Sequence, residues 1–346
     1  MSENLSSRGA AVLDLVVEAY IVSGQPVGST SVATGFAEPI SSATIRNVMA
    51  ELEALGYLSQ PHTSAGRVPT ERGYRRYVER LFRQRRLRRV DEHSIRRRLS
   101  AAQLEVGELL HRACSLLSEL SSHVGVVLTP RPSRTIVQHI EFLRTGADRA
   151  LLLFVTQGGM VYTRTIKVSE ELSESDLGAA AEYLADRFAG HTLGEIRDRL
   201  LDGWEVELPV ESRRQRTAIR IGVRWLVGIG QAEVLVEGAS RLLDNPELSS
   251  AEMLQDVFAT FEEPTQLGNV LTECGGGYDP SVLIGGERLP AALGGCTLIA
   301  ASYMSDGQPV GALGVLGPTR MHYDLTIPLV AATARATSEA IAELCS

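Results

Sequence analysis

The sequence predicts an α+β protein with a helical domain at its N-terminus and a larger domain of mixed strands and helices after it. Three observations support this prediction. The chain has 346 residues, more than one small domain needs, so two or three domains are expected. Its first 88 residues follow mainly a helical apolar pattern. Further along, short runs rich in Val, Ile and Leu alternate with helical segments.

Three helices are expected before the first hairpin. The first follows a helical apolar pattern over residues 10–21. The second is short and begins at Ser29 or Thr30, either of which can cap it. The third begins at Ser41 or Ser42. Its apolar residues at helical spacing form one buried stripe: Ile45, Val48, Met49, Leu52 and Leu55.

A two-stranded hairpin is expected after the third helix, which Gly56 ends as a C-cap. The stretches "GYLSQP" and "GRVPT" read as short strands joined by a polar tip, and Thr70 can cap a fourth helix. Three helices followed by a hairpin is the order of a winged helix-turn-helix, which we place at residues 1–88. In such a domain the third helix enters a DNA groove and the hairpin touches the backbone beside it.

The remaining residues, 89–346, carry the mixed elements. One long amphipathic helix is expected over residues 94–121, and residues 173–228 are expected to be helical with breaks at Gly190 and Pro209. A last helix is expected from Ile327. Strands are expected in the stretches "HVGVVLTP", "TIVQHIEFL", "ALLLFVT", "MVYTRTIKV", "AEVLVEG", "SVLIGG", "CTLIAASYM" and "GALGVLG".

Positive charge is concentrated near the N-terminus. The first 100 residues contain 15 Arg, no Lys and 10 acidic residues, although the whole chain has a net charge of −8. Between residues 67 and 98, 13 Arg face 4 acidic residues. A basic part on an acidic protein predicts a polyanion partner for that part. A solvated, salt-bridged helix face explains the same charges, and charge alone favours this alternative.

The composition argues against several classes of protein. No apolar run reaches the roughly 18 residues of a membrane span, and the N-terminus lacks the basic and apolar regions of a signal peptide. A cytoplasmic location without a membrane partner is therefore expected. The four cysteines are far apart and form no Cys/His cluster, so no disulfide framework, metal site or cofactor is expected.

The third helix offers candidate base-reading residues. DNA-reading helices place residues of their first turns against base edges in the major groove. Thr44 and Asn47 share one face of the helix, and so do Ser42 and Arg46. Arg46 suits guanine O6 and N7, and Asn47 suits adenine N6 and N7. An ordinary amphipathic surface helix would show the same pattern.

The hairpin tip offers candidate donors to the DNA backbone around Gly66: His62, Thr63, Ser64 and Arg67. Such donors suit a phosphate or a narrow minor groove. A single His in a loop does not by itself indicate a binding site. Several donors on a hairpin tip beside a helix that suits a DNA groove favour DNA binding. Arg75 on the fourth helix is a further candidate for a phosphate contact, with solvation as the alternative.

Enzyme interpretations find little support. Walker A, H-E-x-x-H, G-x-S-x-G and a strand-linked G-x-G-x-x-G are absent, so no catalytic residue is predicted. The glycine-rich stretches "CGGGYDP" and "LIGGE" read as turns, or as the lining of a ligand pocket. His139, Glu141 and Asp148 could form an acid/base set, but nothing in the sequence specifies their geometry.

The stretch "SSATIRNVMAELEALGYLSQPHTSAGRVPTERGYRRYV" resembles the N-terminal motif of the HrcA heat-inducible transcription repressors. "QPVGS", "VLIGGE", "CTLIAASY" and "GVLGPTRMHY" resemble the same family, whereas residues 170–260 match it only in general character. The resemblance implies a GAF-like domain at residues 89–346, with a dimerisation segment inserted somewhere within about 165–260. It further implies a homodimer that represses heat-shock (chaperone) operons at an inverted-repeat DNA operator called CIRCE, with the GroE chaperonin as modulator.

Two other functions remain open at this point. The chain could be a small-molecule sensor or an enzyme with an accessory winged helix, in which case a ligand would co-purify or turnover would occur without DNA. It could also carry an RNA-binding winged helix, which would prefer single strands to duplex.

Overall fold

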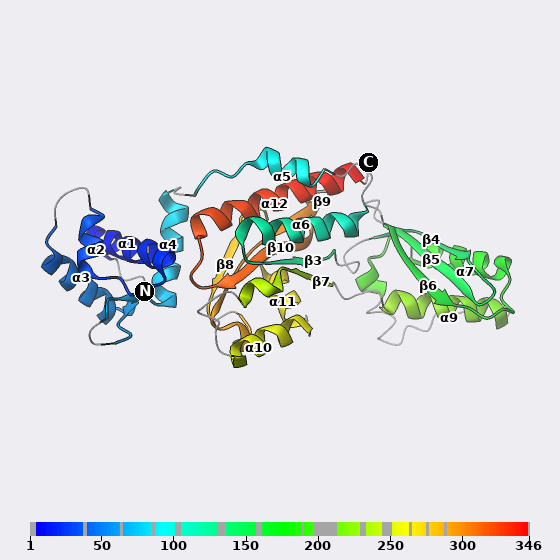
Figure 1. Cartoon of the computed structure of the whole chain (residues 1–346). Coiled ribbons are helices and arrows are strands. Elements are labelled where there is room, and N and C mark those ends of the chain that lie inside the picture. Colours follow the sequence, from blue (N-terminus) through cyan, green and yellow to red (C-terminus); the bar gives the residue numbers. More distant parts are fainter. Residues whose placement is uncertain are drawn as a thin grey trace.

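The computed structural model describes residues 5–36, 40–62, 65–84, 87–100, 105–130, 136–156, 161–188, 190–196, 213–228, 233–243, 251–262, 265–274, 277–286 and 289–344. The molecule is elongated, with a helical region at one end, a five-stranded sheet in the middle and a three-stranded sheet at the other end (Figure 1). This arrangement confirms the expected α+β class. In the described ranges, no helix is both long and apolar enough to cross a membrane.

The N-terminal region has the expected order of helices and hairpin. Its elements are α1 (Ser7–Ser23), α2 (Ser29–Thr34), α3 (Ser42–Ala54), β1 (Leu58–Ser59), β2 (Val68–Pro69) and α4 (Glu71–Gln84). Serine side chains cap two of the helices, as the sequence predicts for α3. Ser6 Oγ accepts from the Gly9 N–H at 3.0 Å, and Ser41 Oγ accepts from the Thr44 N–H at 3.1 Å.

The core of this region joins α1 to α3 and α4. The buried face of α1 includes Leu13 and Val17, which pack in one cluster with Ile45 of α3 and Tyr77 of α4. An ion pair between Arg80 and Asp14 also links α1 to α4, with 3.2 Å between Nη1 and Oδ2. Because Asp14 is buried, its carboxylate requires a charged partner. The same helices that bury the core therefore hold α3 in a fixed orientation.

The segment between α1 and α2 ties down the hairpin. Val27 in this segment forms an antiparallel bridge with Arg67 of the hairpin. Each residue donates its N–H to the carbonyl of the other at 2.9 Å. A Cβ atom at Gly66 would lie 2.4 Å from the Val27 carbonyl oxygen, so only glycine allows this close approach.

The central sheet has the strand order β7-β3-β10-β9-β8 and is antiparallel throughout. Its strands are β3 (Val124–Leu128), β7 (Val234–Glu237), β8 (Ser281–Ile284), β9 (Cys296–Ser305) and β10 (Gln308–Pro318). Helices α5 (Glu92–Arg98), α6 (Val106–Ser121) and α12 (Tyr323–Leu344) lie on one side of the sheet, and α10 (Ala251–Glu262) and α11 (Thr265–Glu273) on the other (Figure 1). Each face of the sheet has its own hydrophobic core, and alternate residues along a strand point to opposite faces. Leu313 therefore packs under α12, and Leu316 packs under α11.

The single helix expected over residues 94–121 is wrong, because the chain forms two helices there. Helix α5 ends at Arg98, its C-cap Leu99 is 1% exposed, and α6 begins after Glu105. The guanidinium of Arg98 binds the Glu119 carboxylate on α6 at 2.5 Å. The break lets α5 and α6 both pack against α12, whereas one straight helix could bury only one of these faces.

The C-terminal helix begins at Tyr323, before the expected start at Ile327. Pro328 lies inside this helix and has no N–H to donate to the carbonyl of Asp324. The backbone N–H of Arg88 donates to that carbonyl instead, at 2.8 Å. A residue remote in sequence thus satisfies the acceptor that the proline leaves open.

A separate module lies between β3 and β7, which are neighbours in the central sheet. It contains β4 (Val137–Arg144), β5 (Arg149–Thr156), β6 (Val161–Lys167), α7 (Glu174–Phe188) and α9 (Arg213–Gly228), and it has its own hydrophobic core. The resemblance placed an inserted segment within about 165–260, whereas the module's described residues begin at 136. Pro209 lies outside the described residues, and Gly190 follows α7 with a φ of 75°.

The central domain consists of the five-stranded sheet and the helices on its two sides. Substitution of two of its glycines by alanine should change its stability in opposite directions. A Cβ at Gly125 on β3 would lie 2.2 Å from the Cys114 carbonyl oxygen of α6, whereas nothing lies within 4 Å of a Cβ at Gly107. We expect Gly125→Ala to destabilise the domain by about 1–3 kcal/mol through overpacking. Gly107→Ala should stabilise it slightly, by up to about 0.5 kcal/mol, because alanine restricts the unfolded chain. Thermal unfolding followed by circular dichroism measures both, and equal midpoints for the two variants would contradict the close packing of α6 on β3.

Candidate nucleic-acid interface

Helix α3 presents an exposed polar face at the outer end of the molecule (Figure 1). Arg46 and Asn47 are exposed, whereas Ser42 and Thr44 are half-buried. The hydroxyl of Thr44 lies 2.8 Å from Ser41 Oγ, so it takes part in the cap of the helix. Of the four residues predicted on α3, Arg46 and Asn47 are therefore the two that project furthest toward a partner.

The hairpin tip lies beside this helix. His62 is exposed, and its carbonyl accepts from the Ala65 N–H at 2.9 Å. Gln60 Nε2 donates to the Ala65 carbonyl at 3.0 Å, which closes the turn from the other side. Thr63 and Ser64 lie outside the described residues. These two hydrogen bonds hold the backbone of the described part of the tip in a turn, and the His62 ring lies at the surface.

Arg67 is placed differently from the free phosphate donor that the sequence predicts. Its guanidinium pairs with the Glu53 carboxylate near the end of α3, with 2.8 Å between Nη2 and Oε2, and its side chain is only 18% exposed. This pair fastens the hairpin to α3, whereas the Val27 bridge fastens it to the segment between α1 and α2. The sequence could not show the pair, because Glu53 and Arg67 belong to different elements.

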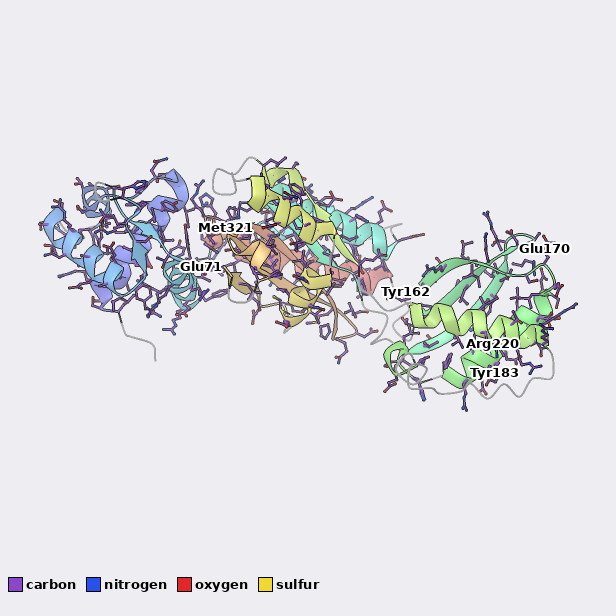
Figure 2. The ribbon with its side chains drawn as sticks, turned by 90° about the horizontal axis from the view of Figure 1, so that it is seen from below. Glu71, Tyr162, Glu170, Tyr183, Arg220 and Met321 are labelled. Atoms are coloured by element: carbon purple, nitrogen blue, oxygen red, sulfur yellow. The ribbon has the colours of Figure 1, made fainter. Side chains whose placement is uncertain are left out.

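Arg75 points toward the central domain and not toward the surface around α3. It donates to the Ile284 carbonyl of β8 at 3.0 Å and to the Glu71 carboxylate at 3.2 Å. Figure 2 labels Glu71 of α4 and Met321 of the loop between β10 and α12. The structure therefore separates Arg75 from the other predicted site residues.

Most of the arginine-rich run is held in ion pairs. Besides Arg67 and Arg75, the pairs are Arg76–Glu79, Arg80–Asp14, Arg88–Asp324, Arg96–Glu339 and Arg98–Glu119. The alternative of a salt-bridged helix face thus describes these arginines well. Arg46 carries the exposed positive charge of α3.

Arg72 makes a structural contact at the end of α3 that the sequence did not reveal. Its Nη1 donates to the Leu55 carbonyl at 2.6 Å, and its guanidinium lies 4.6 Å from the centre of the Tyr57 ring. A cation at the carbonyl end of a helix is favoured by the helix dipole. Arg72 therefore stabilises the end of α3, although no spacing signal connects residues 17 positions apart.

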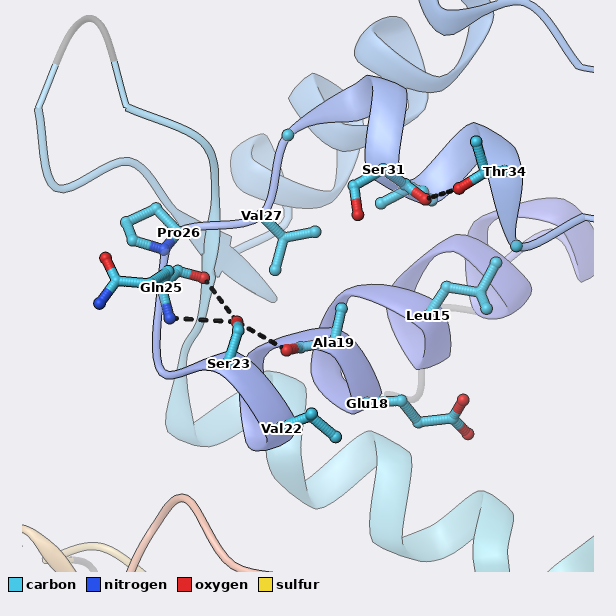
Figure 3. Close-up of a pocket in the computed structure, with 13 residues that line it drawn as sticks. Leu15, Glu18, Ala19, Val22, Ser23, Gln25, Pro26, Val27, Ser31 and Thr34 are labelled. Carbon is cyan, nitrogen blue, oxygen red and sulfur yellow. Dashed lines mark hydrogen bonds between the residues drawn. The ribbon is translucent and has the colours of Figure 1, made fainter.

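A hollow of about 580 Å³ lies between α1 and α2 (Figure 3). Its walls are mainly apolar, with Leu15, Val22 and Val32 among the lining residues. The hydroxyl of Ser23 donates to the Ala19 carbonyl at 2.8 Å, and that of Thr34 donates to the Ser31 carbonyl at 2.7 Å. Ligand sites combine apolar walls with polar groups that converge on the ligand, and here these hydroxyls bind their own helices.

Outside this region, the titratable groups that the structure describes include buried thiols and exposed side chains. Burial raises the pKa of Cys114 to about 12 and that of Cys296 to about 11, so both remain protonated thiols near neutral pH. His139 and Glu141 lie 3.6 Å apart on an exposed face of the three-stranded sheet. Within the described ranges, no group of three His, Cys, Asp or Glu side chains could hold a metal ion.

Comparisons with known proteins agree on one class, the transcription repressors. Residues 107–327 match the family model described as HrcA protein C terminal domain. The heat-inducible transcription repressor HrcA of Geobacter sulfurreducens is 37% identical over 335 residues, which cover 97% of this chain and 98% of that protein. The HrcA repressor of Chromobacterium violaceum is also 37% identical, over 344 residues.

A solved structure shares the fold. It is described as a hypothetical protein at 2.2 Å resolution, superposes with a TM-score of 0.67 at 24% identity, and covers 99% of this chain and 100% of its own. The chain belongs to the HrcA family of heat-inducible transcription repressors, which confirms the resemblance. Membership of this family makes the protein a repressor and not an enzyme.

The Glu53–Arg67 pair yields a test of the hairpin's charge. We expect Glu53→Gln to raise affinity for any duplex DNA, because it frees the guanidinium to approach a phosphate. The slope of log affinity against log salt should steepen by up to about 1, as for one added phosphate contact. Fluorescence anisotropy over a salt series measures this. Glu51→Gln is the matched control, because it removes the same charge from an exposed position of α3. Equal slopes for both variants would contradict the neutralisation of Arg67 by Glu53.

Proposed function

We propose that this repressor binds double-stranded DNA through a winged helix-turn-helix domain at residues 1–88, with α3 in the major groove and the hairpin against the backbone. The exposed pair Arg46 and Asn47 on the outer face of α3 is the observation that carries this proposal. The helix beneath them is held by Ser41 at its start and by Arg72 at its end. A reading helix needs such support, because a base contact depends on a fixed approach to the groove.

The side chains of this face suit specific contacts. Arg46 offers a bidentate donor to guanine, and Asn47 offers a donor and an acceptor to adenine. Ser42 and Thr44 lie near the start of α3, where hydroxyls and helix N–H groups reach phosphates. His62, Thr63 and Ser64 are assigned to the backbone beside the groove. Arg67 contributes there only when its pair with Glu53 opens.

The operator of the proposal is an inverted repeat of the CIRCE type upstream of heat-shock (chaperone) operons, bound by a homodimer. A two-fold dimer places its two reading helices one helical turn, or a multiple of it, apart. Repression of these genes requires access to DNA in the cytoplasm, where we place the protein. Modulation by the GroE chaperonin stays a prediction, and titrating operator occupancy with purified chaperonin tests it.

We further assign residues 89–346 to a GAF-like domain that the module of residues 136–228 interrupts. The central sheet with helices on both sides supports this assignment. The module returns the chain to β7, which pairs with β3 in register from Gly125↔Glu237 to Leu128↔Val234. Such a module can therefore fold on its own core without disturbing the sheet that it interrupts.

The module offers a surface for dimerisation. Helices α7 and α9 cover one face of its sheet, and Figure 2 shows Tyr183 and Arg220 on these two helices. The other face carries apolar side chains that the strand register places together: Leu143, Leu151, Leu153, Val155 and Val161. Leu143 is 43% and Val161 57% exposed, and the three residues of β5 are half-buried. Apolar residues grouped at the surface of a sheet favour a protein partner, and a second copy of this face supplies the two-fold symmetry that the operator requires.

The reading face predicts a loss of sequence preference. Arg46→Ala or Asn47→Ala should cost about 1–3 kcal/mol on the operator and relax discrimination at the contacted base pair. Both variants should lose less affinity for unrelated duplex DNA than for the operator. Competition binding with the operator and with single-base variants measures the effect, and Glu51→Gln on the same helix serves as control. Unchanged preference in Arg46→Ala would show that α3 does not read bases.

The dimer surface predicts that a charge at its centre separates the subunits. Leu153→Lys should raise the dimer dissociation constant by about 30-fold or more, as expected for a buried interface residue worth at least about 2 kcal/mol. Sedimentation velocity over a concentration series measures the change. Glu174→Lys at the start of α7 introduces the same residue on the helical side and should leave the dimer intact. A Leu153→Lys protein that stays dimeric would exclude this face.

A further inference from the structure

Arg320 connects the central domain to the end of α1. It lies in the loop between β10 and α12, and its Nη1 donates to the Ile21 carbonyl at 3.0 Å. Its guanidinium also lies over Gly24, where a Cβ would be 3.2 Å from Arg320 Cζ and where φ is 64°. The carbonyl end of a helix attracts a cation. A single side chain of the central domain thus binds the end of a helix in the DNA-binding domain.

Tyr323 makes a second contact at the same junction. It is fully buried at the start of α12, with its ring centre 6.0 Å from that of Tyr74 and 6.5 Å from that of Tyr77 on α4. Its hydroxyl donates to the Thr319 carbonyl at 2.6 Å, which fixes the ring. Offset and edge-on aromatic pairs at these distances are favourable.

The end of β8 makes a third contact. The Ile284 carbonyl accepts from Arg75 at 3.0 Å, and Gly285 has a φ of 69°. A Cβ on Gly285 would overlap the Glu71 carboxylate at 1.9 Å. The two domains therefore approach closely here, and glycine is the residue that permits it.

These three contacts come from different parts of each domain. On the DNA-binding side they involve the end of α1 and two places on α4, and on the central side the β10–α12 loop, α12 and β8. Domains joined by a linker move relative to each other unless a sizeable or specific interface prevents it. Three contacts on different elements restrict tilting of one domain on the other more than a single contact or a covalent linker does.

We propose that Arg320 is a positioning residue that holds the DNA-binding domain at one angle on the central domain, and so sets the spacing of half-sites that the dimer can bind. This inference rests on the proposed function, because half-site spacing has meaning only for a dimer on an inverted repeat. A rigidly held pair of reading helices matches one separation on the duplex. Loosely held domains accept several separations, but each at a lower effective concentration.

The test compares full-length wild-type protein with Arg320→Ala on four DNAs. These are a single half-site, the inverted repeat, and the inverted repeat with its spacer lengthened by about 5 or about 10 base pairs, which is half or one turn of the duplex. Arg320→Ala should bind the single half-site within about twofold of wild type, and the inverted repeat about tenfold more weakly as effective concentration is lost. Its preference for the original spacer over the half-turn spacer should shrink.

Two further variants separate positioning from general destabilisation. Arg320→Lys keeps a cationic donor for the Ile21 carbonyl and should restore most of the spacing preference. Arg335→Ala is the matched control, because Arg335 pairs with Glu92 at 2.8 Å within the C-terminal part, away from the junction. It should behave as wild type on all four DNAs.

Each alternative result has a distinct meaning. A spacing profile of Arg320→Ala identical to that of wild type would overturn the positioning role alone. Equal loss on the single half-site and on the inverted repeat would also overturn it, because the residue would then act on the reading domain itself. Wild-type protein that does not prefer the inverted repeat would instead overturn the proposed function, and with it the inference.

Discussion

The packing of α12 on the central sheet is the interaction on which the rest of the structure depends. This helix covers β9 and β10, receives α5 and α6 on its sides, and buries most of its residues. Its first residue, Tyr323, also contacts α4 of the N-terminal region. One helix therefore joins the core of the central domain to the N-terminal region. Burial of this many apolar side chains provides the driving force for the packing of α12. The polar contacts around Arg320 determine the angle between the two domains.

Electrostatics serve two purposes at the N-terminal end. In the part of the chain that the structure describes, seven arginines between residues 67 and 98 pair with carboxylates, and three of these partners belong to the central domain. Arg46 lies outside this network on the exposed face of α3. The division follows from geometry. Two arginines of α5 lie against α12 and α6 and meet acidic side chains there. Three arginines of α4 pair within α4 or with Asp14 of α1, whereas α3 faces away from the central domain. Net charge alone would not distinguish the two groups.

The inserted module is nearly independent of the sheet that it interrupts. It has its own core around Phe154 and Phe188, and its open apolar face lies at the far end of the molecule from α3 (Figure 1). A dimer formed there would place the reading domains at a distance from the contact that joins them. Any looseness along the chain would then be amplified at the DNA, which is why the junction at Arg320 matters for a protein of this shape.

Local signals in the sequence determined much of the fold and part of the site. Helical periodicity and the Ser41 cap predicted α3, the change of period after Gly56 predicted the hairpin, and the same positions placed Arg46 and Asn47 on an exposed face. These features depend on neighbours within a few residues. The tertiary structure decided the rest, because it depends on partners far apart in the chain. The N–H of Arg88 donates to the Asp324 carbonyl that Pro328 leaves without a donor. Leu99 is buried in the core at the point where α5 ends. Glu53 pairs with Arg67 and neutralises its charge. Periodicity contains no information on such partners, so only the folded chain shows which charges remain available for DNA.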